Sequence, residues 1–313
     1  MVNAIAVIWD CDKTLIDGYM QSEMFKDLGI NEQEFWKETN ALPEKIMETQ
    51  RVKVNKDTVY LNQFINKIKN GEFNCNEPID NNWLKKYGKT LRYYPGMPEF
   101  LLTLKQMLEK DENSATYKEF NIVVENYIVS TGFKAVIEGS ELNEDDKVKG
   151  IWGCELIEGE VNGKQQISEI GYTIDNTTKT RALFEVNKGV NIDPNIDVNA
   201  KVPEELRRIP FERMIYIADG PSDVPAFSVV NKGGGYTFAV YPKGDLKAFE
   251  QVERLRADGR IQMYAEANYT EGSTAYMVIT HFVKSMADSI VESERQRRYS
   301  IISDAPGHLP IKK

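Results

Sequence analysis

Residues 4–14 have the sequence AIAVIWDCDKT, and this stretch decides the fold. Its first six residues form a short, continuous apolar run with several β-branched side chains, which is typical of a strand buried on both faces of a parallel sheet. Two aspartates, Asp10 and Asp12, follow this strand. Positions two apart in extended backbone share a side and lie roughly 6 to 7 Å from each other. The two carboxylates can therefore flank one reacting atom while Cys11 faces away.

Two later apolar runs also end on polar residues. The run 122–129 leads into Ser130-Thr131-Gly132, and the run 214–218 leads into Asp219, with Asp223 four residues further on. In open parallel sheets, ligands bind beyond the carboxyl ends of the strands. The sequence therefore predicts one crevice at which the three strand ends bring these polar groups together.

Strand and helix patterns alternate along most of the chain. Apolar runs predict four strands, at 4–9, 122–129, 214–218 and 236–241. A hairpin is expected within 151–174, because Asn162-Gly163 is a tight-turn signal. Alternation of this kind favours a parallel sheet with helices on its faces. We predict an α/β fold, with a Rossmann-like parallel sheet core and an inserted all-helical cap domain.

A helical block interrupts the alternation directly after the first strand. Within 19–92, apolar residues recur three and four positions apart, and we expect roughly four helices and no strand there. The α/β catalytic core is assigned to residues 1–15 and 93–250, the cap to 16–92, and a C-terminal helical extension and tail to 251–313. The extension contains a helix from about Ser273 to Arg297, and we expect the last dozen residues to be frayed.

Composition excludes several classes of function. The chain has 313 residues and a formal net charge of −9, so it would repel a nucleic-acid backbone. Two histidines, His281 and His308, make a catalytic triad or a histidine-rich zinc site a poor expectation. Three widely spaced cysteines suit a reducing compartment. We expect a cytoplasmic protein that has no targeting signal and binds neither nucleic acid nor membrane.

The predicted crevice is strongly acidic and needs a cation. Asp10, Asp12, Asp219 and Asp223 would repel by about 4 kcal/mol per pair at 4 Å and an effective dielectric of 20. Oxygen ligands without histidine or cysteine suit a hard ion, and Mg²⁺ characteristically joins one or two carboxylates to phosphate and waters. The metal and a lysine would neutralise a phosphoryl group on which Asp10 makes an in-line attack, and water would hydrolyse the aspartyl-phosphate.

These residues resemble the four motifs of the haloacid dehalogenase superfamily: Asp10-x-Asp12-x-Thr14, then Ser130, then Lys179 opening a helix, then Asp219-Gly220-Pro221-Ser222-Asp223. The resemblance spans about residues 5 to 240. It implies that Asp10 is the nucleophile, Asp12 the general acid and base, and Ser130 and Lys179 phosphate holders together with Thr131 and Gly132. It also implies a magnesium site formed by Asp10, Asp12 through its backbone carbonyl, Asp219 and Asp223, in which Asp223 orients the metal waters or Lys179.

The position of the helical block and the sequence Val129-Ser130-Thr131-Gly132-Phe133 are similar to the phosphoserine phosphatase branch, which has a helical cap. One residue departs from that branch: Tyr19 stands where those enzymes place a glutamate that reads the substrate. This departure argues against phosphoserine itself, and the expected substrate is a small phosphorylated metabolite. The cap side chains considered for selecting the leaving group are Tyr19, Met20, Arg51, Trp83 and Arg92.

Several alternatives stay open at this stage. Lys188 or Lys164 could take the place of Lys179, which is favoured by its position before a helix. A magnesium-dependent phosphomonoester hydrolase is the leading prediction for the chain. A phosphotransferase or mutase would use the same intermediate, and a non-catalytic scaffold would bind phosphate without turnover. The apolar face of the last helix suits either core packing or a homodimer interface.

Overall fold

The structure, a computed structural model, describes residues 2–193 and 195–303. Its centre is a seven-stranded sheet with the strand order β4-β3-β2-β1-β5-β6-β7. All neighbouring strands are parallel except β3 and β4, which form an antiparallel hairpin. The predicted Rossmann-like α/β core is confirmed. The strands are β1 (Asn3–Trp9), β2 (Ile122–Phe133), β3 (Gly150–Val161), β4 (Lys164–Tyr172), β5 (Met214–Ala218), β6 (Tyr236–Tyr241) and β7 (Met263–Glu266).

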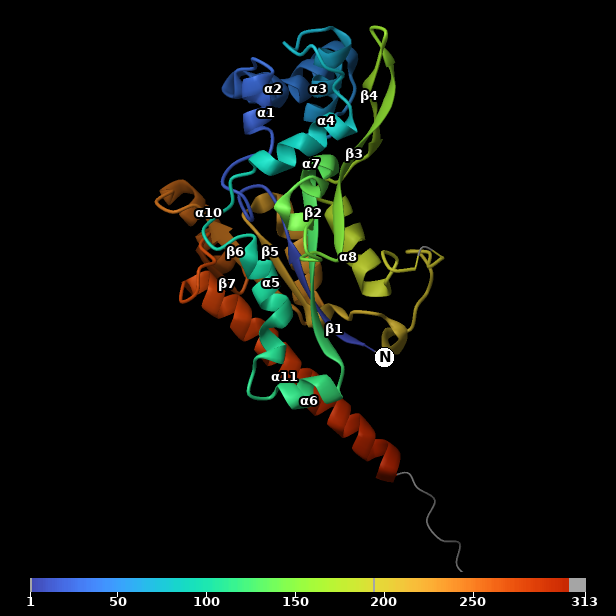
Figure 1. Cartoon of the computed structure of the whole chain (residues 1–313), viewed down its shortest axis with the longest axis vertical. Helices are drawn as coiled ribbons and strands as arrows, with labels where there is room; N and C mark the ends of the chain where they lie inside the picture. Colours follow the sequence, from blue (N-terminus) through green and yellow to red (C-terminus); the bar gives the residue numbers. More distant parts are fainter. Residues whose placement is uncertain (1, 194, 304–313) are drawn as a thin grey trace, which may run out of the picture.

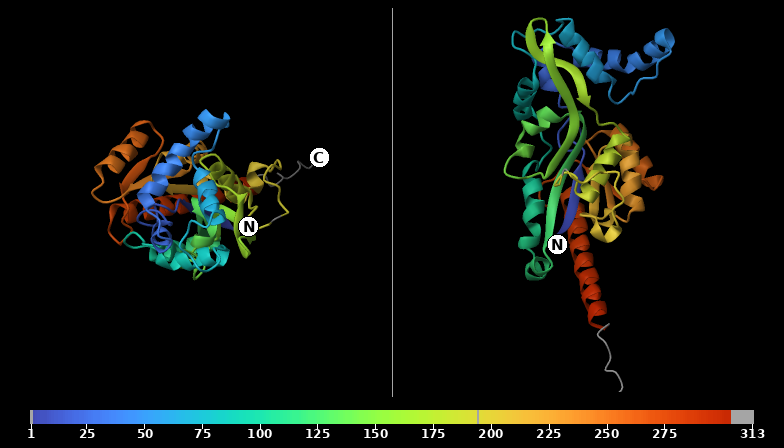
Figure 2. Two further views of the ribbon diagram at one scale, coloured as in Figure 1. Left: turned by 90° about the horizontal axis from the view of Figure 1, so that it is seen from above. Right: turned by 90° about the vertical axis from the view of Figure 1, so that its right-hand side faces the viewer.

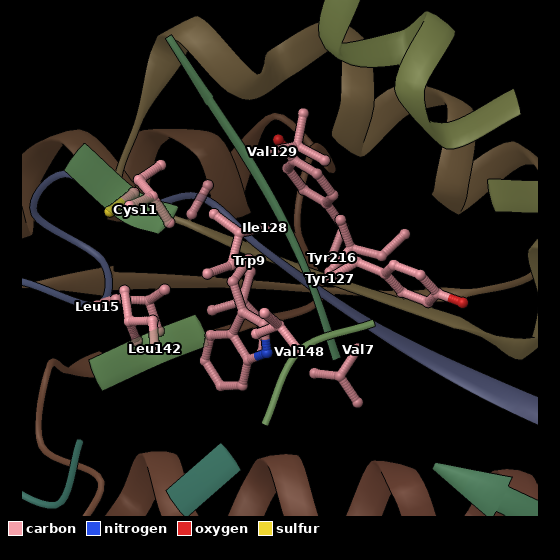
Figure 3. Close-up of a cluster of buried hydrophobic side chains, with 14 of the residues drawn as sticks. Val7, Trp9, Cys11, Leu15, Tyr127, Ile128, Val129, Leu142, Val148 and Tyr216 are labelled. Carbon is pink, nitrogen blue, oxygen red and sulfur yellow. The ribbon is translucent and has the colours of Figure 1, made fainter. Parts of the chain in front are cut away.

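Helices cover both faces of the sheet (Figures 1 and 2). One face carries α5 (Glu99–Gln106), α6 (Ser114–Glu119) and α11 (Thr274–Ser303). The other carries α8 (Thr178–Lys188), α9 (Val224–Lys232) and α10 (Leu246–Ala257). Figure 3 shows buried side chains of the central strands, among them Trp9, Tyr127 and Tyr216, packed together with Cys11. Burial of these large apolar groups on both sides of β1 fixes the strand at the centre of the sheet.

The register of the central strands aligns their carboxyl ends. Trp9, the last residue of β1, pairs with Ile128 of β2 and with Ile217 of β5. The Asp10 amide continues the ladder by donating to the Ile217 carbonyl at 2.9 Å. As a result, the residues after Trp9, Val129 and Ala218 lie at one edge of the sheet. The predicted end of the second strand at residue 129 is wrong, because β2 continues through Ser130, Thr131 and Gly132 to Phe133, with an irregular register against β3 between Val129 and Phe133.

Residues 19–92 contain four α-helices: α1 (Ser22–Asp27), α2 (Glu32–Gln50), α3 (Val59–Lys69) and α4 (Asn81–Lys86). Figure 1 places them beyond the carboxyl edge of the central strands. The chain enters and leaves this block at one point, because the Asp17 amide donates to the Arg92 carbonyl at 2.7 Å and the Tyr94 amide to the Leu15 carbonyl at 3.1 Å. Paired linkers allow an insertion without disturbing the sheet. The division into a core and a cap domain stays a prediction.

Two features differ from the sequence expectations. The outer half of the β3–β4 hairpin, assigned to the core, lies along the helical block (Figure 1): the Ile167 amide donates to the Ile79 carbonyl at 2.8 Å, and Asn81 Nδ2 to the Leu156 carbonyl at 3.0 Å. The second is β7, a seventh strand of the sheet that lies within the range assigned to the C-terminal extension.

Two further features complete the described fold. The turn Asn162-Gly163 connects β3 to β4 as expected, and a short helix α7 (Lys134–Glu138) follows β2. Residues 304–313, for which fraying was predicted, lie outside the described residues. Within the described part of the chain, we find no helix that combines the length and the apolar character needed to span a membrane.

Candidate active site

The loop after β1 curls tightly and turns both of its aspartates to the sheet edge. The Cys11 carbonyl accepts hydrogen bonds from the Thr14 and Leu15 amides at 3.2 and 2.9 Å, and Lys13 adopts a left-handed conformation with φ of 57°. The Asp12 Oδ1 atom accepts the Met20 amide at 2.9 Å. Cys11 is fully buried in the apolar cluster, so it faces away from the two aspartates as predicted.

The start of α8 delivers a lysine to the same place. Asp175 Oδ1 accepts the Thr177 and Thr178 amides at 2.9 and 2.7 Å, which satisfies free N–H groups of the first turn. Lys179, one residue later, is 1% exposed. Its Nζ atom lies 2.8 Å from Asp10 Oδ1 and 2.6 Å from Asp223 Oδ1. This ammonium group therefore links the ends of β1, α8 and the segment after β5.

The two rival lysines lie elsewhere. Lys188 Nζ donates to the carbonyls of Val198 and Ala200, both at 2.6 Å. Lys164 Nζ donates to the Asn76 carbonyl at 2.9 Å, at the tip of the hairpin. Of the three candidates, Lys179 is the lysine that contacts the aspartates.

Asp223 is held by more groups than the sequence indicated. It ends a short 3-10 helix, Pro221–Asp223, directly before α9. Besides Lys179, the Tyr216 hydroxyl donates to its Oδ1 at 2.6 Å, and the Ser222 hydroxyl donates to its Oδ2 at 2.8 Å. Burial and the Asp223 carboxylate hold the pKa of Tyr216 well above its usual value, so its hydroxyl stays a donor. No sequence motif indicated the contacts that Tyr216 and Ser222 make with Asp223.

Three carboxylates form a compact acidic group. One oxygen each from Asp10, Asp219 and Asp223 lies within 4.8 Å of the others. Burial raises the pKa of Asp10 to about 6, although the Lys179 ammonium opposes the shift. Burial, followed by repulsion from Asp10 and Asp223, raises the pKa of Asp219 to about 8. Ionisation of these carboxylates is therefore unfavourable in the metal-free protein, and a bound cation would reduce the repulsion between them.

Asp12 has a separate place beside this group. Burial and the Asp10 carboxylate raise its pKa to about 7, although the hydrogen bond from the Met20 amide lowers it. A carboxyl group with this pKa can exchange protons near neutral pH. For Lys179, burial acts to lower the pKa, but the Asp10 and Asp223 carboxylates outweigh it and hold the pKa well above its usual value. The lysine therefore stays charged.

The last residues of β2 provide buried polar groups. Ser130 is 1% exposed, and its hydroxyl accepts the Gly132 amide at 3.0 Å. The Thr131 carbonyl accepts the Tyr60 hydroxyl at 2.7 Å. Met20 covers these residues: its Sδ accepts the Phe133 amide at 3.1 Å, and a Cβ atom added to Gly132 would lie 2.3 Å from the Met20 Cε. The end of the Met20 side chain therefore packs directly against the Gly132 backbone.

The other cap candidates have different surroundings. Tyr19 is 40% exposed and accepts a hydrogen bond from Lys13 Nζ at 2.9 Å. Arg92 pairs with Glu23. Trp83 is buried against Tyr87, with ring centroids 4.6 Å apart. Arg51 ends α2 in a left-handed conformation and is exposed.

An uncharacterized protein of Borreliella burgdorferi is 33% identical over 288 residues, which cover 88% of this chain and 94% of that protein. The chain therefore belongs to the family of the Borreliella protein. No protein-family model matches the sequence.

Solved structures identify the fold. A phosphoserine phosphatase, in a structure of its phospho-aspartyl intermediate analogue, matches with a TM-score of 0.51 and 16% identity over 90% of this chain and 99% of that chain. This chain has the haloacid dehalogenase fold. A substrate-bound phosphoserine phosphatase complex matches with a TM-score of 0.48 and 14% identity over 90% of this chain and all of that chain. A HAD family hydrolase from Salmonella enterica serovar Typhi matches with a TM-score of 0.47 and 17% identity, over 84% of this chain and 67% of that chain. The fold that the motif resemblance implies, with the arrangement seen in phosphoserine phosphatase, is confirmed.

Proposed function

We propose that this chain is a Mg²⁺-dependent phosphomonoester hydrolase that works through an aspartyl-phosphate on Asp10. One observation carries the proposal: the buried Lys179 ammonium bridges Asp10 and Asp223 beside Asp219, at the edge where the central strands end. This arrangement pairs a carboxylate nucleophile with a fixed positive charge that can hold a phosphoryl group. The haloacid dehalogenase fold supports the same reaction class.

The chemistry divides between the two aspartates of the first loop. An Asp10 oxygen attacks phosphorus in line, the bond to the leaving oxygen breaks, and Asp12 gives its proton to that oxygen. Water then attacks phosphorus, and Asp12 takes a proton from the water as phosphate leaves Asp10. The pKa of Asp12, raised to about 7 by burial and by Asp10, suits both directions of proton transfer.

The donor set fits Mg²⁺. The Asp10 and Asp219 carboxylates and the Asp12 main-chain carbonyl would hold the ion, and all are oxygen donors, as a hard cation requires. When bound, the ion supplies positive charge to the phosphoryl oxygens. Asp223 offers an oxygen to the same group, but both of its oxygens accept hydrogen bonds from Lys179, Tyr216 or Ser222. We therefore assign Asp223 chiefly to positioning Lys179, while Ser130, Thr131 and Gly132 contact the phosphate.

A panel of phosphomonoesters tests this function. Purified protein with Mg²⁺ should release inorganic phosphate, and chelation of the metal with EDTA should stop the release. Addition of a large excess of an acceptor alcohol separates the rivals: a phosphotransferase would form the new ester at the expense of phosphate. Phosphate binding without release from any ester would favour the non-catalytic scaffold.

Stabilisation by Mg²⁺ should increase with pH between 6 and 8. The pKa values of Asp10 and Asp219 are raised to about 6 and 8, above that of an unfolded aspartate, so the metal-free native state binds protons that the unfolded chain has lost. Its stability therefore falls as pH rises through this range. Mg²⁺ must displace these protons, so its apparent affinity weakens as pH falls. At a hundred times its dissociation constant, the ion adds about 2.7 kcal/mol.

Thermal unfolding at pH 6 and pH 8, with and without one fixed Mg²⁺ concentration, measures this effect. The rise in melting temperature caused by Mg²⁺ should be larger at pH 8. An equal or larger rise at pH 6 would place the metal away from these carboxylates.

A further inference from the structure

The peptide unit between Thr131 and Gly132 is held at both of its ends. Its carbonyl oxygen accepts the Tyr60 hydroxyl at 2.7 Å and the Cys154 thiol at 3.3 Å. Its N–H group, which belongs to Gly132, donates to the Ser130 hydroxyl oxygen at 3.0 Å. Because a trans peptide is planar, its C=O and N–H groups point in opposite directions. The groups that hold the carbonyl therefore also direct the N–H toward Ser130.

The Ser130 hydroxyl keeps its own proton for another partner. Among the residues that the structure describes, this hydroxyl makes one hydrogen bond, in which it accepts the Gly132 amide. A serine hydroxyl carries one donor proton besides its acceptor lone pairs. Ser130 is 1% exposed and lies two residues beyond Ile128, which pairs with Trp9 directly before Asp10. The proton is therefore available to an oxygen of a phosphoryl group bound at this edge of the sheet.

These groups form one chain of donors and acceptors. Tyr60 donates to the carbonyl, the amide of the same peptide donates to Ser130, and Ser130 has a proton to donate to the phosphoryl group. In such a chain each hydrogen bond polarises the next, and the effect is stronger where water is excluded. Tyr60 and Cys154 are 5% and 2% exposed, so the chain runs through the interior of the protein.

Tyr60 belongs to the helical block and not to the strand that it contacts. It lies in the first turn of α3. Its ring packs against Phe133 at the end of β2 with centroids 5.7 Å apart, and the ring of Phe64 does so at 5.2 Å. Two ring contacts and the hydroxyl bond thus dock α3 on the last residues of β2. The hydroxyl is the part of Tyr60 that reaches the peptide before Gly132.

Tyr60 is the stronger of the two donors to the Thr131 carbonyl. Its distance of 2.7 Å is that of a good O–H···O bond, whereas a thiol is a weak donor. Burial, followed by the Cys154 and Asp12 groups, holds the pKa of Tyr60 well above its usual value, so its hydroxyl stays protonated. Without this hydroxyl, the carbonyl would keep the thiol as a partner, but the peptide would be held less firmly.

We propose that Tyr60 is a positioning residue for phosphate binding, which acts through the Thr131–Gly132 peptide to orient the Ser130 hydroxyl toward the phosphoryl group. The inference rests on the proposed function of the same site. Tyr60 itself does not touch the substrate in this scheme. The helical block then helps to build the phosphate site, whereas a block that only covered the site would add nothing to the affinity for inorganic phosphate.

Tyr60→Phe tests the proposal on the Mg²⁺-loaded full chain, because it removes the hydroxyl and keeps the ring contacts. The dissociation constant for inorganic phosphate, measured by calorimetry, should rise about three- to tenfold, the usual effect of one lost hydrogen bond. The value of kcat/KM should fall by a similar factor for esters with different leaving groups, because Ser130 contacts the phosphoryl group that they share. Unchanged phosphate binding, or a loss seen with one kind of leaving group alone, would overturn the proposal.

A double-mutant cycle with Ser130→Ala separates positioning from a merely structural role. If Tyr60 acts through the Ser130 hydroxyl, Tyr60→Phe should change phosphate affinity and kcat/KM by less than about twofold in the Ser130→Ala background. Equal fold-changes in the two backgrounds would mean that Tyr60 acts independently of Ser130, which contradicts the proposal.

Tyr117→Phe is the control, since it also removes one hydroxyl from a buried tyrosine. The Tyr117 hydroxyl donates to Asp288 at 2.6 Å between α6 and α11, far from the helical block (Figure 1). This variant should have a lower melting temperature and unchanged phosphate binding. A loss of phosphate affinity here as well would assign the effect of Tyr60→Phe to general destabilisation and exclude the positioning role.

Failure of the proposed function gives a different result from failure of the inference. If the wild type binds inorganic phosphate but hydrolyses no ester, the proposed function fails, and the phosphate dissociation constants of the variants still decide the role of Tyr60. If the wild type hydrolyses esters and Tyr60→Phe matches it, the function stands and the inference fails. A wild type that neither binds phosphate nor hydrolyses an ester would contradict both.

Discussion

Asp10→Asn is expected to lower kcat by roughly a thousandfold or more, whatever the best substrate proves to be. The carboxamide has nearly the shape of the carboxylate but lacks the anionic oxygen that attacks phosphorus, and loss of a nucleophile commonly has effects of this size or larger. The fold should survive, because Lys179 keeps its contact with Asp223 at 2.6 Å when the Asp10 charge is removed. Removal of one of three crowded carboxylates also relieves repulsion in the metal-free protein.

Steady-state phosphate release, thermal unfolding and intact-mass spectrometry after an acid quench together check this prediction. The wild type should show a species carrying one added phosphoryl group during turnover, and Asp10→Asn should not. Asp258→Asn, an exposed aspartate just after α10, provides the matched control and should keep wild-type activity. Retention of turnover and of the phosphorylated species in Asp10→Asn would assign the attack to another side chain.

Sequence alone could predict the parts of the fold whose burial is complete. The strands β1, β2, β5 and β6 are apolar runs because both faces of the central sheet are covered, and such runs are visible without coordinates. The four residues of β7, Met-Tyr-Ala-Glu, form no such run, because this strand lies at the sheet edge and is half exposed. The position of the β3–β4 hairpin depends on contacts with residues 79–81, which no local pattern encodes.

Much the same limit applies to the site. The proximity of Asp10, Asp219 and Asp223 could be predicted from the sequence, because these residues follow strands that must end at one edge of the sheet. The contribution of Tyr216 could not be predicted, because every residue of β5 is buried and alternation cannot show which of its side chains face the aspartates. The sulfur contact of Met20 with the end of β2 could not be predicted either, because it depends on how the chain folds back after Gly18. Three-dimensional packing, which the motif spacing does not contain, decides these contacts.

The free energy of unfolding of Lys179→Met at pH 7.5 without metal should be about 3–5 kcal/mol lower than that of the wild type. The variant should also lose its turnover. A buried ion pair that loses one partner leaves uncompensated charge, and here a single ammonium serves two buried carboxylates. Methionine preserves most of the apolar volume, so packing contributes little to the loss. Lys188→Met is the control on the same helix: its ammonium binds two backbone carbonyls and pairs with no carboxylate among the described residues, so its loss of stability should be much smaller.

The pH dependence of this loss separates charge from packing. The Asp10 and Asp223 carboxylates keep the pKa of Lys179 well above its usual value, so the wild-type lysine is charged from pH 5 to pH 7.5. Asp10 and Asp219, whose pKa values are raised to about 6 and 8, are largely protonated at pH 5, and their protonation removes most of the repulsion that the lysine offsets. Denaturant unfolding of both proteins should therefore show a larger loss at pH 7.5 than at pH 5. Equal losses at the two pH values would mean that Lys179 stabilises the core by its side-chain volume and not by its charge.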